Sequence, residues 1–137
     1  MTRTLDQRGV AAFEFCIVAA VFFTLVFAIF DFGRYAITMQ SLRALANAGA
    51  RAMMVKCYTP DVINNTSPSG CTGDYLTDEQ KQAIAPFLYA GGLSPIVSTT
   101  QTGSVLTVTA SQPGFAMLVP IWGTSLDKPS ASTLVPF

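Results

Sequence analysis

The residues that could carry chemistry in this chain are few and widely spaced. The sequence contains no histidine, which removes the commonest general base and metal ligand and the usual partner of a nucleophilic serine or cysteine. The carboxylates of the C-terminal part show no pairing that favours acid–base catalysis; they are Asp61, Asp74, Asp78, Glu79 and Asp127. We therefore expect a protein that is not an enzyme and that has no cofactor and no metal site.

The carboxylate in the most unusual setting is Glu14, which lies within the apolar stretch Val10–Phe30. That stretch, about 20 residues, is long enough to cross a bilayer as a helix. A carboxylate inside such a helix is costly and usually has a partner. The simpler alternative is that Glu14 lies near the interface and extends its side chain to water.

A short polar lead, residues 1–9 (MTRTLDQRG), precedes the apolar stretch. A secretory signal peptide would need a shorter apolar core and a small-residue cleavage site after it. Instead, the stretch continues through Asp31-Phe32-Gly33-Arg34 into more helix-compatible sequence. An uncleaved signal anchor is an alternative, but it leaves Glu14 without a role.

Helical periodicity continues beyond the membrane stretch. One apolar stripe, rich in small residues, recurs at spacings of three and four; it comprises Tyr35, Met39, Leu42, Leu45, Ala46, Gly49, Ala52 and Met53. The opposite face carries Gln40, Arg43, Asn47 and Arg51. No proline occurs between Val10 and Val55, so we expect one rod of roughly 70 Å. The stripe can cover the protein's own domain, pack against other subunits, or do both in different portions.

Several short motifs along this segment fit one known pattern. They are Arg8-Gly9, Glu14-Phe15, Asp31-Phe32-Gly33-Arg34 and Gly49-Ala50-Arg51. Over about residues 8–55 the chain resembles the TadE-like family of the tight-adherence (Flp, type IV) pilus machinery. Two departures stand out: many members have a proline within the membrane run, where this chain has Ala19-Ala20, and the acidic residue before Gly-Arg is often Glu. The missing proline predicts a straighter helix.

The resemblance implies specific roles for the N-terminal residues. A prepilin peptidase would cut between Gly9 and Val10, and Glu14 would become the fifth residue of the mature protein. Glu14 would then pair with the N-terminal amine of a neighbouring subunit during assembly, which fits the rule that a buried carboxylate needs a cationic partner. The partners implied are other pilin subunits, the prepilin peptidase and inner-membrane lipid.

Asp31 and Arg34 are three residues apart, so on a helix they can form an ion pair. We interpret this pair as solvated or lying at headgroup level, where it marks the end of the membrane span.

Cys57 and Cys71 flank a loop rich in Pro, Asn, Ser and Gly. If the N-terminus stays in the cytoplasm, this loop lies in the periplasm or outside, where disulfides form. A Cys57–Cys71 bond would stabilise the loop by about 3 kcal/mol. Cys16, in the membrane run, is expected to act as a small apolar residue.

The C-terminal part predicts one helix and a small antiparallel sheet. Thr77 and Gln80 form a capping-box pattern for a helix that runs to Ala90, with a kink at Pro86, and stops at Gly91-Gly92. Alternation over 96–100 and 104–110 predicts a hairpin, with Leu106, Val108 and Ala110 on one face. The proline-rich tail allows one more edge strand, and we expect Trp122 to pack under the sheet.

The whole chain thus predicts an α+β, pilin-like architecture. Its parts are a leader (1–9), a transmembrane and extended helix (10–55) and a small periplasmic or extracellular domain (56–137). Zero formal net charge without a basic cluster gives no support for nucleic-acid binding. The expected protein is a minor pilin or pseudopilin in the bacterial inner membrane, with a cytoplasmic N-terminus, and in the pilus if it enters a filament. The alternatives are a constitutive component of the same apparatus and a membrane-anchored periplasmic ligand- or protein-binding module.

Overall fold

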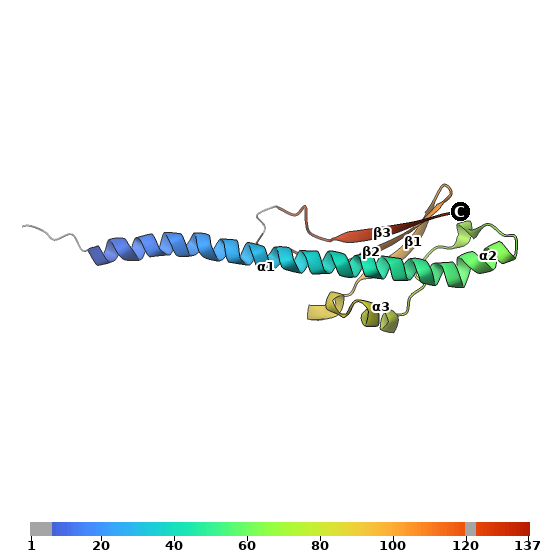
Figure 1. Cartoon of the computed structure of the whole chain (residues 1–137), viewed down its shortest axis with the longest axis horizontal. Coiled ribbons are helices and arrows are strands. Elements are labelled where there is room, and N and C mark those ends of the chain that lie inside the picture. Colours follow the sequence, from blue (N-terminus) through green and yellow to red (C-terminus); the bar gives the residue numbers. More distant parts are fainter. Residues whose placement is uncertain (1–6, 120–122) are drawn as a thin grey trace, which may run out of the picture.

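A long N-terminal helix dominates the architecture (Figure 1). The computed structural model describes residues 7–119 and 123–137. Helix α1 spans Gln7–Met53, continues through a π-helical turn, η1 (Met54–Tyr58), and ends in α2 (Thr59–Ile63). A small sheet and a short helix pack around its C-terminal half, whereas its N-terminal half projects alone (Figure 1). The predicted α+β class is therefore confirmed.

The helical rod is longer at both ends than the sequence predicted. It already includes Gln7 and it passes Val55, where we expected it to end. Pro60 does not stop it because this proline lies in the first turn of α2, where its missing N–H would have no intrahelical partner. The π turn shifts the register just before α2, which lets the helix continue through Ile63.

The sheet has three antiparallel strands in the order β1-β2-β3. Strands β1 (Ile96–Thr102) and β2 (Val105–Ser111) form the predicted hairpin, and Gly103 in its turn has a positive φ of 61°. Strand β3 (Ser130–Pro136) is the expected additional edge strand. Leu106, Val108 and Ala110 lie on one face of β2, as predicted, and their side chains are buried. The expectation for Trp122 concerns a residue outside the described ranges.

The predicted capping box is present, because Thr77 and Gln80 each bond the other's backbone N–H at the start of α3 (Asp78–Ile84). The prediction that this helix reaches Ala90 is wrong. Pro86 cannot donate an intrahelical hydrogen bond, and a separate 3-10 segment, η3 (Pro86–Gly92), follows. Another 3-10 turn, η2 (Pro68–Gly70), precedes Cys71.

The core lies between the C-terminal half of α1 and the sheet. The small-residue stripe provides much of it, since Leu42, Leu45, Ala46 and Met53 are fully buried. At Gly49 the backbone of α1 approaches β2 so closely that an added Cβ would lie 3.1 Å from Val108 Cγ1. The stripe thus covers the protein's own domain, as one of the two interpretations expected.

Candidate functional site

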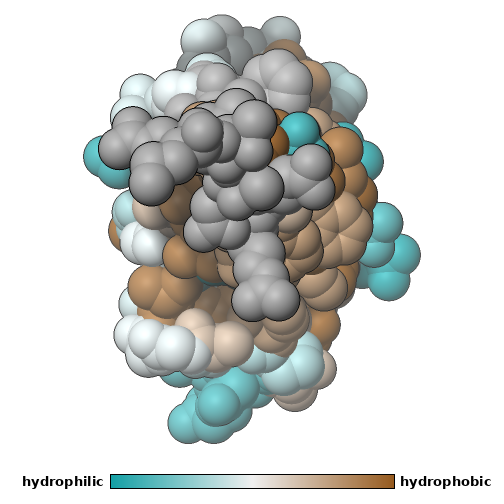
Figure 2. Space-filling view, turned by 90° about the vertical axis from the view of Figure 1, so that its left-hand side faces the viewer, coloured by the Kyte–Doolittle hydropathy of each residue, from teal (hydrophilic) through white to brown (hydrophobic). Residues whose placement is uncertain are grey.

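The N-terminal half of α1 exposes an apolar surface on all sides. Large side chains along it are at least half exposed; they include Val10, Phe13, Phe15, Val18, Val21, Phe22, Leu25, Phe27, Ile29 and Phe30. Figure 2, which views the molecule from this end, shows mostly hydrophobic surface with hydrophilic groups at the periphery. An uncovered apolar surface of this extent marks contact with lipid or with other protein. Among the described residues, this is the one helix with the length and composition of a membrane span.

Gly9, Val10 and Glu14 lie together at the start of this exposed helix. Val10 and Glu14 are four residues apart and share one face. Open space surrounds Gly9, since nothing lies within 4 Å of where a Cβ would be. Glu14 is exposed, and none of the ion pairs among residues 7–119 and 123–137 includes it. The Glu14 carboxylate therefore lies on an exposed helix face, and the described residues of the same chain give it no cationic partner.

Asp31 and Arg34 lie where α1 enters the domain. Arg34 Nη1 donates to Asp31 Oδ1 at 3.1 Å, and the backbone N–H of Val119 donates to Asp31 Oδ2 at 2.9 Å. Asp31 is only 2% exposed, so our interpretation of a solvated pair is wrong for its acidic member. The loop after β2 covers this carboxylate, and that loop is 88 positions away along the chain. The pair therefore joins the exposed apolar half of α1 to the domain.

Aromatic contacts strengthen the same junction. The Arg34 guanidinium lies 5.3 Å from the centroid of the Phe115 ring, within the range of a cation–π interaction. The Tyr35 ring is 6.2 Å from the same ring. Contacts from Asp31, Arg34 and Tyr35, within little more than one helical turn, thus hold the end of the exposed helix segment against the domain.

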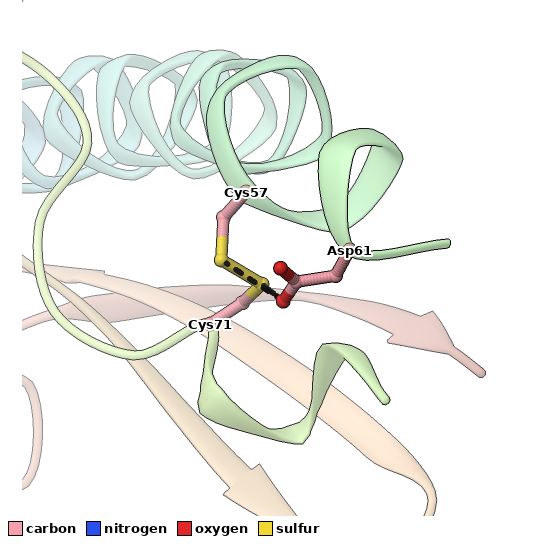
Figure 3. A group of neighbouring side chains, drawn as sticks. All are labelled: Cys57, Asp61 and Cys71. Carbon is pink, nitrogen blue, oxygen red and sulfur yellow. Dashed lines mark hydrogen bonds between the residues drawn. A yellow bond between two sulfur atoms is a disulfide. The ribbon is translucent and has the colours of Figure 1, made fainter. Parts of the chain in front are cut away.

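The other end of the rod carries a disulfide. Cys57, at the end of η1, is bonded to Cys71 at 2.08 Å. Figure 3 shows the Asp61 carboxylate directed at this bond; its Oδ2 lies 3.4 Å from Cys71 Sγ and 3.7 Å from Cys57 Sγ. These three residues have the atom types of a metal cluster, but a disulfide offers no thiolate to a metal ion. The group is therefore a disulfide crosslink between the end of the helix and the loop that contains Cys71.

Sequence reasoning missed two buried polar groups. Lys81 is buried and pairs with Asp74 at 2.6 Å and with Asp78 at 3.0 Å. Burial alone would lower the Lys81 pKa, but hydrogen bonds and charge from both carboxylates outweigh it and raise that pKa above 10.5. Gln112 is buried beside η3 and bonds Leu88 O. The i, i+3 spacing of Asp78 and Lys81 was a local signal, whereas no local signal marked Gln112.

Comparison with known proteins finds a family match for part of the helix. Residues 9–51 match the TadE-like protein family. The resemblance predicted from the sequence is thereby confirmed, and the TadE-like segment includes Glu14, Asp31 and Arg34 and ends before Cys57. No curated protein and no solved structure matches the chain. A TadE-like segment indicates a protein associated with the tight-adherence pilus, in a family that is typically non-enzymatic.

Proposed function

We propose that this protein is a minor pilin or pseudopilin of a tight-adherence pilus. A prepilin peptidase removes residues 1–9, Val10 becomes the N-terminus, and α1 holds the subunit in the inner membrane before assembly. Assembly proceeds by packing of the exposed part of α1 against other pilin subunits. Glu14 takes its partner, the N-terminal amine of a neighbouring subunit, in that step.

The observation that carries the proposal is the exposed apolar helix that begins with Gly9, Val10 and Glu14. Its side chains need an apolar environment, which lipid supplies before assembly and other helices supply after it. A carboxylate in such surroundings requires a cation, and a cleaved chain would bring one at its new N-terminus. The TadE-like match, which begins at Gly9, supports the same conclusion.

The proposed orientation has the N-terminus in the cytoplasm and the domain in the periplasm. Two observations support it. Arg3 and Arg8 lie in the short lead before the span, and basic residues favour the cytoplasmic side. The Cys57–Cys71 disulfide lies in the domain on the other side, and disulfides persist in oxidising compartments.

The deciding experiment is N-terminal sequencing, with intact-mass measurement, of the protein purified from membranes of its native host. We expect a chain that begins at Val10. A Gly9→Val variant should stay full-length, while a Gly33→Ala variant, changed outside the cleavage site, should be processed normally. A wild-type chain that still begins at Met1 or Thr2 in cells with active prepilin peptidase would refute the proposal.

Glu14 provides the second arm of this test. A Glu14→Gln variant should be cleaved normally but should be depleted from sheared pili, because its side chain can no longer pair with an ammonium group. Equal amounts of the variant and wild-type subunits in the sheared fraction would show that Glu14 is not needed for assembly. Complete absence of the wild-type protein from that fraction would favour a constitutive membrane component of the apparatus.

A second candidate is a membrane-anchored binding module with an uncleaved anchor. It is favoured by a groove of about 530 Å³ between α1 and α3, whose lining includes Asn47, Arg51, Leu76 and Ile84, a size typical of ligand sites. This alternative predicts an intact leader and a Glu14→Gln variant without effect on pili. The two experiments above therefore separate the candidates.

A further inference from the structure

The Asp61 carboxylate lies against the Cys57–Cys71 disulfide (Figure 3). Its Oδ2 is 3.4 Å from Cys71 Sγ and 3.7 Å from Cys57 Sγ, so it is close to both sulfurs. The spacing along the chain explains the approach, because Asp61 follows Cys57 by four residues and the helix continues from η1 into α2. A group that attacks either sulfur therefore comes near this carboxylate.

The charge of this carboxylate has no counterion among the described residues. None of their ion pairs includes Asp61, and Lys56, beside Cys57 in the chain, donates to Tyr75 O at 2.7 Å instead. The two sulfurs offer no compensation, because a disulfide sulfur carries no proton. Burial is the main cause that raises the pKa of the Tyr75 phenol above 10.0, and the Asp61 charge adds to it. Asp61 thus places an uncompensated negative charge beside the disulfide.

Reduction of a disulfide begins with the attack of an anion. A thiolate forms a bond to one sulfur, the existing S–S bond breaks, and its electron pair leaves on the other sulfur, which then takes a proton from water. A second thiolate resolves the mixed disulfide, so two reductant thiols become one disulfide. Cys71 is fully buried and Cys57 is half-buried. Because the attacking species is negatively charged, a negative charge beside the bond opposes its approach.

We propose that Asp61 protects the Cys57–Cys71 disulfide electrostatically from thiol–disulfide exchange. The crosslink between the end of the long helix and the loop then persists when small thiols are present around it. At a separation of about 4 Å in water, repulsion between two unit charges lowers a rate about fivefold. The repulsion is greater for a thiol that carries further negative groups and smaller for one that carries a cation. This role needs neither leader cleavage nor pilus assembly.

The test measures the rate at which three thiols reduce the full-length, oxidised protein in mild detergent at low ionic strength. Glutathione carries net negative charge in addition to its thiolate, 2-mercaptoethanol carries none, and cysteamine carries an ammonium group. Acid stops the reaction, and free cysteines are then alkylated in denaturant and counted by mass spectrometry. The oxidised chain takes one label, on Cys16, and the reduced chain takes three. Comparing variant and wild type with the same thiol cancels the thiol's own reactivity.

Asp61→Asn should speed reduction by glutathione about tenfold, by 2-mercaptoethanol about fivefold, and by cysteamine no more than about twofold. Asparagine has nearly the same size, and the backbone carbonyl at position 61 still accepts from Thr66, so the loop keeps these bonds. Glu79→Gln is the matched control, because it removes one negative charge from an exposed residue of α3. It should leave all three rates unchanged.

The grading by thiol charge decides the outcome. Equal acceleration of all three thiols in Asp61→Asn would show that the substitution loosens the loop, and it would overturn the proposal. Unchanged rates would overturn it as well, because burial alone would then protect the bond.

Salt provides a second measurement, which needs no variant. Because salt screens exposed charges, it should raise the wild-type rate with glutathione and leave the rate with cysteamine nearly constant. A glutathione rate that does not depend on salt would refute the electrostatic role even if Asp61→Asn failed to fold. None of these outcomes depends on where the mature chain begins, so they are independent of the cleavage test.

Discussion

The backbone N–H of Val119 donates to Asp31 Oδ2 at 2.9 Å, across 88 positions of the chain. Asp31 also accepts from Arg34, so one buried carboxylate links the helix to the last part of the domain. The position of the exposed half of α1 against the domain thus depends on a polar contact as well as on apolar packing.

Replacing Asp31 should destabilise the junction. Asp31→Ala leaves Val119 N–H and Arg34 without their acceptor, and we expect a loss of about 2–3 kcal/mol in the free energy of unfolding. Asp31→Asn keeps an acceptor for Val119 and should lose about 1 kcal/mol. Urea unfolding of the full chain in mild detergent, followed by circular dichroism, measures both. Arg43→Gln is the control, and equal stability of Asp31→Ala and wild type would contradict the role.

Two glycines of α1 should respond oppositely to alanine. At Gly49 the new methyl would lie 3.1 Å from Val108 Cγ1 and 3.2 Å from Val97 Cγ1. Because β-branched valines in a sheet cannot easily move aside, overpacking of about 1–3 kcal/mol should exceed the gain in helix propensity. At Gly33 nothing lies within 4 Å, so alanine should stabilise by up to about 1 kcal/mol. If both alanine variants changed the free energy of unfolding in the same direction, the close approach of the sheet to Gly49 would be refuted.

The disulfide predicts a definite pattern of thiol labelling. In denaturant without reductant, iodoacetamide should modify Cys16 alone; after reduction it should modify all three cysteines. The Cys57→Ala/Cys71→Ala double variant should lose about 2–4 kcal/mol of unfolding free energy, whereas Cys16→Ala should lose little. Mass spectrometry counts the labels, and three labels on the unreduced protein purified from its native host would contradict the disulfide.

Stability should fall at alkaline pH. The Lys81 pKa is raised above 10.5 by Asp74 and Asp78, against the opposing effect of burial. Burial is the main cause that raises the pKa of Tyr89 above 10.0. In each case the folded state holds its proton more tightly than the unfolded state. The Lys81 contribution is thus complete below pH 10.5 and disappears as pH rises through the raised folded-state pKa.

Substitution separates these alkaline contributions. Lys81→Met should lower stability by about 1–2 kcal/mol at neutral pH, because Asp74 is partly exposed and its interaction is screened, and it should flatten the decline above pH 10. Tyr89→Phe should flatten the same decline while retaining the Lys81 pairs. Denaturant unfolding at several pH values between 8 and 11 measures each slope. A slope in Lys81→Met identical to that of wild type would show that the lysine does not contribute.

Local patterns were sufficient for the elements of the fold. Apolar residues over 10–30 require a helix in lipid, because only a helix satisfies its own backbone there. The Thr77–Gln80 capping box and the 96–110 alternation involve residues a few positions apart, so their geometry follows from short-range sterics and hydrogen bonds. The predicted end of the long helix was less accurate. A π turn includes Val55, where we expected the helix to stop, and α2 follows with a proline in its first turn.

Chain length and residue type already implied a membrane helix with a lone acidic group at Glu14, a small α+β domain and two cysteines in one loop. Only the folded chain shows that Asp31 is buried and bonded by Val119, and that the sheet packs closely against Gly49. It also shows that Gln112 Oε1 is buried without a hydrogen-bond partner among the described residues. Each of these depends on residues far apart in sequence. Packing of a sheet against a helix decides which polar groups lose water, and that loss makes Asp31 and Arg34 the junction between α1 and the domain.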